Sequence, residues 1–414
     1  MNRPEFISSS VAHSPMAYRP DIDGLRSIAV MVVVLFHAGF DTLSGGFIGV
    51  DVFFVISGFL ITKLLVTEYE ATGRVDFAQF YLRRVRRLFP ALFTVLAVSM
   101  IPAFLMFTSE DMEETAASAI FSIYSLSNVF FWATSDYFDA GAKLKPFLHT
   151  WSLSVEEQFY LFWPVLLLIL MKMGRRVAPF VLLLLMIGSL VIAEYWLRSD
   201  SPGWFGLDMN QAAFYLLPAR VSELGLGAIL VWGQRFRPSN NAVNEILLLL
   251  GLGLIVWSAF TFNSEMSFPG LSALVPCTGA ALAIMSGTAR YSGFLLRNRL
   301  AVFLGLISYS IYLVHWPLLV YYQTYTYRSL TTPESYALVA LSILCGWLLY
   351  RYVEQRFRRQ RPQGSWTPAG FAFGASFLAI LFILPAAGAW ASDGWKWRIP
   401  ECLLQKEVSD FSGL

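Results

Sequence analysis

Arg26 and His37 place a cation and an imidazole on one face of a predicted helix. They are eleven residues apart, which is three turns plus about 20°, so their side chains share a face about 16 Å apart along the axis. An unperturbed imidazole pKa of about 6.5 suits His37 to act as a general base or as a transient group carrier. Because ionisable groups at membrane depth are costly, we predict a functional role for both residues. The alternative is an ordinary boundary arginine and a hydrogen-bonded histidine.

A second group of reactive side chains occupies residues 149–160, HTWSLSVEEQFY, where an apolar stretch begins. The adjacent Glu156 and Glu157 point about 100° apart on a helix, so we expect one of them to face the protein interior as a catalytic or substrate-orienting acid. His149 is a secondary candidate. The alternative is that the acids only complement the positive start of the helix dipole.

A third group lies on one predicted helical face. Ser308, Tyr312 and His315 occupy positions i, i+4 and i+7, and we expect His315 at a depth similar to that of His37. Tyr312 and His315 are therefore further candidate site residues. The alternative is a polar seam that only joins two helices.

Four arginines in the segment RRVRR, Arg83, Arg84, Arg86 and Arg87, could bind an anion. Guanidinium forks match phosphate oxygens, which predicts a cytoplasmic site for a phosphorylated ligand. Arg83 with Arg86 and Arg84 with Arg87 share the same RxxR spacing, so the binding pair stays open. A positive-inside anchor on an interfacial helix is the alternative.

Asp51 and Arg220 are charged residues within apolar stretches, and Glu223 lies one turn after Arg220. We favour structural ion partners over catalysts for these residues. The three cysteines lie far apart and the sequence has no CxxC or HExxH, so it indicates neither a disulfide framework nor a metal site.

The composition requires a membrane to position these groups. Hydrophobic residues make up 56% and charged residues 14% of 414 residues, which excludes a soluble domain and a disordered chain. The net charge of +2 gives no basis for nucleic-acid binding. The apolar residues form long runs and do not alternate, which excludes an outer-membrane barrel.

The runs predict an all-α integral membrane protein with about eleven spanning helices, each about 20 residues long. With the N-terminus in the cytoplasm, 22 Lys and Arg fall on the inner side and seven on the outer side, and the C-terminus is extracytoplasmic. The more polar stretch 116–134 would reverse this balance if it crossed, so we expect a re-entrant or interfacial helix there. The expected spans are 25–43, 47–67, 88–107, 153–171, 178–197, 213–233, 244–262, 271–288, 301–322, 336–352 and 369–391.

Five motifs in this order resemble the acyltransferase family 3 membrane proteins, which include bacterial O-acetyltransferases of lipopolysaccharide and other surface glycans. The resemblance runs from about Tyr18 to Arg361. It rests on RPDIDGLRSIAV (19–30) with the R-x10-H spacing, GGFIGVDVFFVISGFLI (45–61), RxxR, HTWSLSVEEQFY and SYSIYLVHWP (308–317).

The resemblance implies an enzyme of the bacterial cytoplasmic (inner) membrane that transfers an acyl group, most often acetyl, from acetyl-CoA to a glycan hydroxyl such as that of lipopolysaccharide O-antigen. It implies His37 and Arg26 as catalytic residues with Glu156 or Glu157, the arginines of 83–87 as the coenzyme A site, and Asp23 as a further motif residue. It requires no metal. Acyl-CoA, membrane lipid and a lipid-linked or surface glycan are the implied partners.

We expect a polar segment at 1–18, the acyltransferase domain at 19–361, and a linker with an extra eleventh span at 362–393. Some relatives continue past such a span into an SGNH-type domain, so we interpret 394–414 as an extracytoplasmic tail that could lead to one. The competing function is a proton-coupled transporter or flippase, because intramembrane His and Glu also suit proton coupling.

Overall fold

The expected all-helical class is confirmed. The computed structural model describes residues 18–134, 137, 144–174, 176–199, 207–358 and 368–399, and these residues form helices and connecting turns without a strand. The expected segment 1–18, except Tyr18, and the tail beyond Ile399 lie outside the described residues. The helices are α1 (Pro20–His37), α2 (Gly49–Thr72), α3 (Phe77–Met106), α4 (Ser109–Ile123), α5 (Ser127–Thr134), α6 (Thr150–Met173), α7 (Val177–Leu197), α8 (Met209–Tyr215), α9 (Leu217–Gly233), α10 (Asn241–Thr261), α11 (Leu274–Ser286), α12 (Phe294–Arg297), α13 (Arg299–Leu306), α14 (Ser308–Thr326), α15 (Thr332–Leu349), α16 (Gln355–Arg358) and α17 (Pro368–Ala391).

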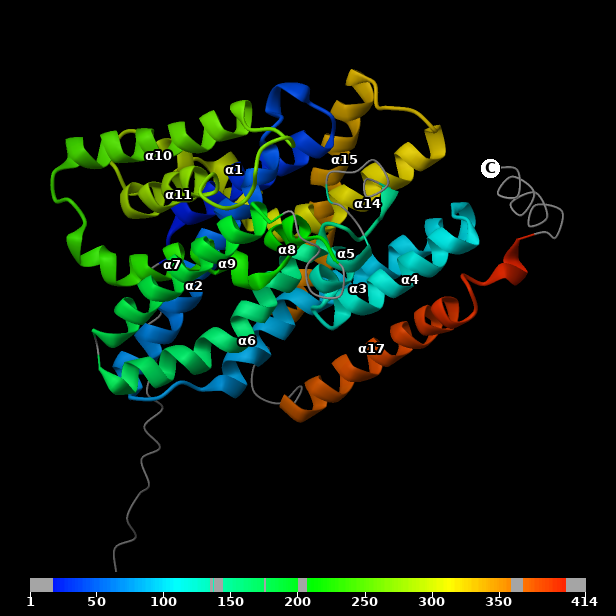
Figure 1. The fold of residues 1–414 in the computed structure, drawn as a ribbon, viewed down its shortest axis with the longest axis horizontal. Helices are drawn as coiled ribbons and strands as arrows, with labels where there is room; N and C mark the ends of the chain where they lie inside the picture. The colour runs from blue at the N-terminus through cyan, green and yellow to red at the C-terminus, as the bar shows by residue number, and fades with distance from the viewer. Residues whose placement is uncertain are drawn as a thin grey trace, which may run out of the picture.

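Helix α1 lies inside the bundle, where it packs against α2, α11, α13 and α14. Ala29, Val30 and Val33 of α1 are completely buried. Figure 1 shows α10 and α11 along one edge of the molecule and α17 along the opposite edge, beside α4. Arg26 in the second turn of α1 and His37 at its end are therefore held by several helices at once.

Helices α2 and α9 cross at a pair of glycines. A Cβ atom at Gly58 would lie 1.8 Å from the carbonyl oxygen of Leu224, and one at Gly227 would lie 1.9 Å from that of Val55. Only glycine allows this approach, which is how small residues serve helix packing in membranes. The contact fixes the rotation of α2 about its axis, and therefore which face of α2 points away from α9.

Seven helices are long and apolar enough to cross a membrane, or eight if one bent pair is counted, among the residues that the structure describes. The expected stretches 25–43, 271–288 and 369–391 correspond to α1, α11 and α17, which fall outside this count. Helix α1 carries Asp21, Asp23 and Arg26 within 18 residues. Helix α11 has only 13 residues, about 20 Å against a hydrocarbon core of about 30 Å. Helix α17 is 24 residues long, and the count covers only its part Ala379–Ala391.

The expected span 301–322 is not one straight helix. It consists of α13 and α14, which meet at a bend of 67° around Ile307. The bend follows Gly305, where a Cβ atom would lie 1.8 Å from the carbonyl oxygen of Asp23. The bend lets α13 press against the start of α1 while α14 runs past its other end.

The stretch 116–134 is not a single helix either. Helices α4 and α5 cover it and are separated by a turn in which Ser125 adopts a φ of 57°. Lys145 forms an ion pair with Glu114 of α4 and donates to the carbonyl oxygen of Thr134, at the end of α5, at 3.1 Å. Because one lysine reaches an early turn of α4 and the last residue of α5, the chain turns back on itself here.

Candidate active site

A cavity of about 220 Å³ lies between α1, α2, α3, α6 and α14. Along α2 its wall extends from Val50 to Leu64, which is about 21 Å at 1.5 Å per residue. The wall is largely apolar, with charged groups only on three of the five helices. Its polar and aromatic members include Arg26, Ser57, Arg84, Arg87, Ser152, Glu156, Tyr160, Ser308, Tyr309 and Tyr312.

The structure distinguishes between the two arginine pairs that sequence spacing leaves open. Arg84 and Arg87 line the cavity, whereas Arg83 and Arg86 do not. The Arg84 guanidinium lies 4.9 Å from the ring centroid of Tyr160, and the buried Nε of Arg87 has no hydrogen-bond partner among the described residues. Arg83 Nη2 lies 3.8 Å from Glu68 Oε2, and 43% of the Arg83 side chain is exposed. The cavity therefore has Arg84 and Arg87 available for an anion.

Arg26 joins this group from α1. Its Nη1 lies 4.0 Å from Asp23 Oδ1, and the Tyr18 hydroxyl donates to Asp23 Oδ2 at 2.7 Å. Asp23 thus holds the arginine without lining the cavity itself. Three guanidinium groups from two helices consequently converge on one chamber, an arrangement suited to a phosphorylated ligand.

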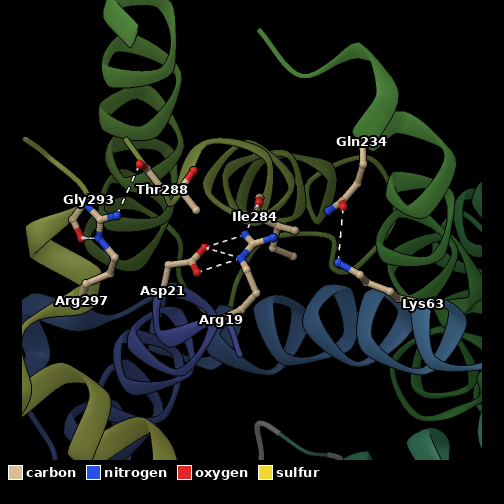
Figure 2. Close-up of polar contacts among 8 residues, drawn as sticks. All are labelled: Arg19, Asp21, Lys63, Gln234, Ile284, Thr288, Gly293 and Arg297. Atoms are coloured by element: carbon tan, nitrogen blue, oxygen red, sulfur yellow. Dashed lines mark hydrogen bonds and ion pairs between the residues drawn. The ribbon is translucent and has the colours of Figure 1, made fainter. Parts of the chain in front are cut away.

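The first residues of the RPDIDGLR motif do not belong to the cavity. Figure 2 shows Arg19 paired with Asp21 and directed at α11. Arg19 Nη2 donates to the Ile284 carbonyl oxygen at 2.7 Å, and Arg297 Nη1 donates to that of Thr288 at 3.3 Å. Arg19 and Arg297 complement the partial negative charge at the C-terminal end of α11, and their role is therefore structural.

Both glutamates line one small cavity, but only Glu156 also lines the main cavity. Glu156 lines the cavity and accepts hydrogen bonds from the Ser57 hydroxyl at 2.8 Å and the Tyr160 hydroxyl at 3.2 Å. Glu157 lines a smaller cavity of about 20 Å³, and its Oε1 has no partner among the described residues. Glu156 is therefore the acid that shares the main cavity wall with Arg26, Arg84 and Arg87.

His37 and His315, for which the sequence predicts only a similar depth, are in direct contact. His37 Nδ1 lies 3.1 Å from His315 Nε2, and His37 Nε2 lies 3.1 Å from the Tyr137 hydroxyl. His315 is fully buried, whereas His37 is partly exposed. His149 packs edge-on to His315 with ring centroids 5.8 Å apart.

The histidines lie beyond the end of the cavity and are not part of its wall. Tyr312 separates the two, because its ring lines the cavity while its hydroxyl donates to the His149 carbonyl oxygen at 2.9 Å. The Ser152 hydroxyl lies 2.7 Å from the same tyrosine oxygen.

Asp51, Arg220 and Glu223 form a buried ion cluster apart from the cavity. Arg220 Nη1 lies 2.9 Å from Asp51 Oδ1 and 2.8 Å from Glu223 Oε1, and each side chain is at most 2% exposed. The Arg220 guanidinium also lies 5.4 Å from the Trp151 ring. This geometry fits structural ion partners, the interpretation favoured from the sequence.

Sequence reasoning assigned no role to Ser57, Tyr137, Ser152 or Tyr160. The i, i+4 spacing of Glu156 and Tyr160 was a usable signal for a shared face, but no local pattern indicates that Tyr137 reaches His37. Among the described residues, no group of three or more His, Cys, Asp and Glu side chains could hold a metal ion.

Residues 19–351 match a family model described as an acyltransferase domain. The chain is similar to peptidoglycan O-acetyltransferase OatA of Listeria monocytogenes serovar 1/2a, at 32% identity over 361 residues, covering 83% of this chain and 56% of the relative. It is also similar to O-acetyltransferase OatA of Staphylococcus aureus strain MRSA252, at 29% identity over 409 residues, covering 93% and 65%. The chain thus spans less than two thirds of the length of these relatives. No solved structure matches it.

Proposed function

The chain belongs to the acyltransferase 3 family, and from this premise we propose that it is a membrane O-acyltransferase that moves an acetyl group from cytoplasmic acetyl-CoA to a hydroxyl of an extracytoplasmic glycan. The observation that carries the proposal is one cavity with Arg26, Arg84 and Arg87 in its wall and a hydrogen-bonded histidine pair just beyond Tyr312. The names of the relatives, O-acetyltransferases, support the same chemistry.

In this proposal the arginines bind the phosphates of coenzyme A and the apolar wall accepts the pantetheine arm. A cavity length of about 21 Å along α2 suits such an extended arm. The thioester reaches the histidines when the side chains of Ser152 and Tyr312 move aside.

The chemical step replaces a carbon–sulfur bond with a carbon–oxygen bond. The acceptor oxygen attacks the thioester carbonyl carbon, its proton passes to His37, and the coenzyme A sulfur leaves and takes up a proton, so no oxidant or metal enters the balance. His37 acts either as the general base for the hydroxyl or as a transient acyl carrier. Glu156 holds the cavity wall through Ser57 and Tyr160.

The proposed setting is the bacterial inner membrane, with the N-terminus and the arginines on the cytoplasmic side and the hairpin of α4 and α5 re-entrant from the outer side. We propose a surface glycan as acceptor. The relative from Listeria is named for peptidoglycan, and lipopolysaccharide remains the acceptor expected from the sequence, so both belong in the test. An SGNH-type domain or partner would receive or pass on the group outside.

The test uses the full chain in proteoliposomes with acetyl-CoA labelled in the acetyl group, and with peptidoglycan or lipopolysaccharide fragments as acceptors. We expect labelled ester on one glycan, and mass spectrometry identifies it. His37→Ala should abolish transfer but retain coenzyme A binding. Solute flux without consumption of acetyl-CoA would instead support a transporter or flippase, and full activity of His37→Ala would remove His37 from the mechanism.

A further inference from the structure

The contacts of the two histidines determine which ring nitrogens carry protons. His315 Nδ1 lies 2.6 Å from the backbone carbonyl oxygen of Tyr312. A carbonyl oxygen only accepts, so Nδ1 of His315 carries the hydrogen, and Nε2 of the neutral ring is an acceptor. Nε2 lies 3.1 Å from His37 Nδ1. His37 Nδ1 must therefore carry a hydrogen and donate it to His315.

In the neutral pair, the lone pair of His37 is then on Nε2, which lies 3.1 Å from the Tyr137 hydroxyl. The two imidazoles are nearly parallel, at 12° with centroids 5.3 Å apart, and Trp316 packs edge-on to His37 at 4.5 Å. The ring of His37 is thus fixed in its plane as well as in its tautomer. Its basic nitrogen points at a hydroxyl, and a glycan hydroxyl could take the same place.

We infer that His315 is a positioning residue that fixes the Nδ1–H tautomer of His37 and so presents the Nε2 lone pair to the acceptor hydroxyl. The inference rests on the proposed function and deepens it. A base needs a partner that orients it, as the carboxylate does in a Ser-His-Asp triad. Here the partner is neutral and its own orientation comes from the Tyr312 carbonyl, which cannot rotate or titrate.

A neutral partner suits the position. His315 has no solvent exposure, and burying a carboxylate there would require a further cation to compensate it. When His37 takes the hydroxyl proton, its Nδ1–H···Nε2 hydrogen bond becomes charge-assisted and strengthens. His315 therefore assists the transition state without touching the substrate.

The inference is tested with His315→Gln and His315→Leu in the full chain. The amide oxygen of glutamine can accept from His37 Nδ1 in the place of Nε2, whereas leucine cannot. We expect kcat for labelled acetyl transfer to fall roughly 100-fold or more in His315→Leu and to recover largely in His315→Gln. KM for acetyl-CoA should stay unchanged in both variants because His315 does not line the cavity.

Nitrogen NMR of histidine-labelled protein gives a readout that does not depend on activity. The signal of His37, assigned by its loss in His37→Asn, should show an unprotonated Nε2 and a protonated Nδ1 in the wild type and in His315→Gln. An unprotonated Nδ1 in the neutral wild-type ring would overturn the inference, as would full activity of His315→Leu or an equal loss in both variants. Absence of transfer by the wild type would sink the proposed function while the NMR result still decided the tautomer.

Discussion

The arginines of α3 have different surroundings because they lie on different faces of the helix. Arg84 and Arg87 are three residues apart, line the cavity and share it with Arg26. Arg83 begins the same spacing one residue earlier, about 100° around the helix, and turns to Glu68. A shift of one position thus decides between a place in the cavity wall and an ion pair at the surface.

We therefore predict that replacing Arg84 and Arg87 together by alanine weakens coenzyme A binding by roughly 100-fold or more. Hydrogen bonds to charged groups contribute about 1.5–3 kcal/mol each, and each 1.4 kcal/mol is a factor of about ten. Isothermal titration calorimetry on detergent-solubilised protein measures the change. Replacing Arg83 and Arg86 by alanine is the matched control, with affinity expected within about twofold of the wild type. Equal losses of coenzyme A affinity in the two double variants would show that the four arginines contribute only a general positive charge.

Sequence reasoning could identify most of the residues of the site but not their pairings. Helical periodicity placed Ser308 and Tyr312 on one face, and both line the cavity. The contact between His37 and His315 joins residues that are 278 positions apart, and no local spacing encodes such a pairing. The choice between Glu156 and Glu157 likewise depends on the neighbours, since only Glu156 meets Ser57.

Elements were predictable where hydrophobicity alone defines them. The helices α2, α6, α7 and α10 each coincide closely with an expected span, whereas α3 begins at Phe77, eleven residues before the span expected at 88–107. The bend between α13 and α14 was not predictable, because it depends on the approach of Gly305 to the backbone of α1. Hydropathy reports how apolar a stretch is and carries no information about such a contact between helices.

The crossing of α2 and α9 leads to a prediction about helix packing. Gly58→Ala should destabilise the protein by about 1–3 kcal/mol, because the new methyl group would overlap the Leu224 carbonyl and force the helices apart. It should also reduce transfer, since Ser57 next to it contacts Glu156. Thermal unfolding in detergent, followed by tryptophan fluorescence, measures the stability.

The matched control is Gly253→Ala in α10, where an added Cβ atom meets nothing within 4 Å. Alanine has the higher helix propensity, so this variant should be neutral or more stable by up to about 1 kcal/mol. If the two variants shifted the unfolding temperature alike, close packing of α2 on α9 would not explain the effect.

At the scale of the whole molecule, the proposed reaction requires the two ends of the bundle to face different compartments. Arg84 lies near the start of α3, and Tyr321 near the end of α14 donates to the Ser99 carbonyl oxygen further along α3 at 2.6 Å. The end of α14 is therefore remote from the arginines. If the chain crosses the membrane eleven times, as the sequence predicts, 22 Lys and Arg fall inside and seven outside, which favours the arginine end as cytoplasmic.

Cysteine labelling tests this arrangement in a background in which Cys277, Cys345 and Cys402 are replaced by alanine. Arg83 has an exposed side chain near the arginine end, and Tyr327, after α14, is 91% exposed. A membrane-impermeant maleimide should label Tyr327→Cys in intact cells and Arg83→Cys only after permeabilisation. The reverse pattern would place coenzyme A and the arginines on opposite sides of the membrane and end the proposed route.

The hairpin of α4 and α5 makes the same experiment more stringent. Glu110 in the first turn of α4 and Ala133 near the end of α5 are both exposed, and Lys145 reaches the two helices at that level. A re-entrant hairpin requires Glu110→Cys and Ala133→Cys to label from outside in intact cells, together with Tyr327→Cys. If Ala133→Cys required permeabilisation while Glu110→Cys did not, the chain would cross here. Every later basic cluster would then change sides, and the arginines and the histidine pair could not bridge the membrane as proposed.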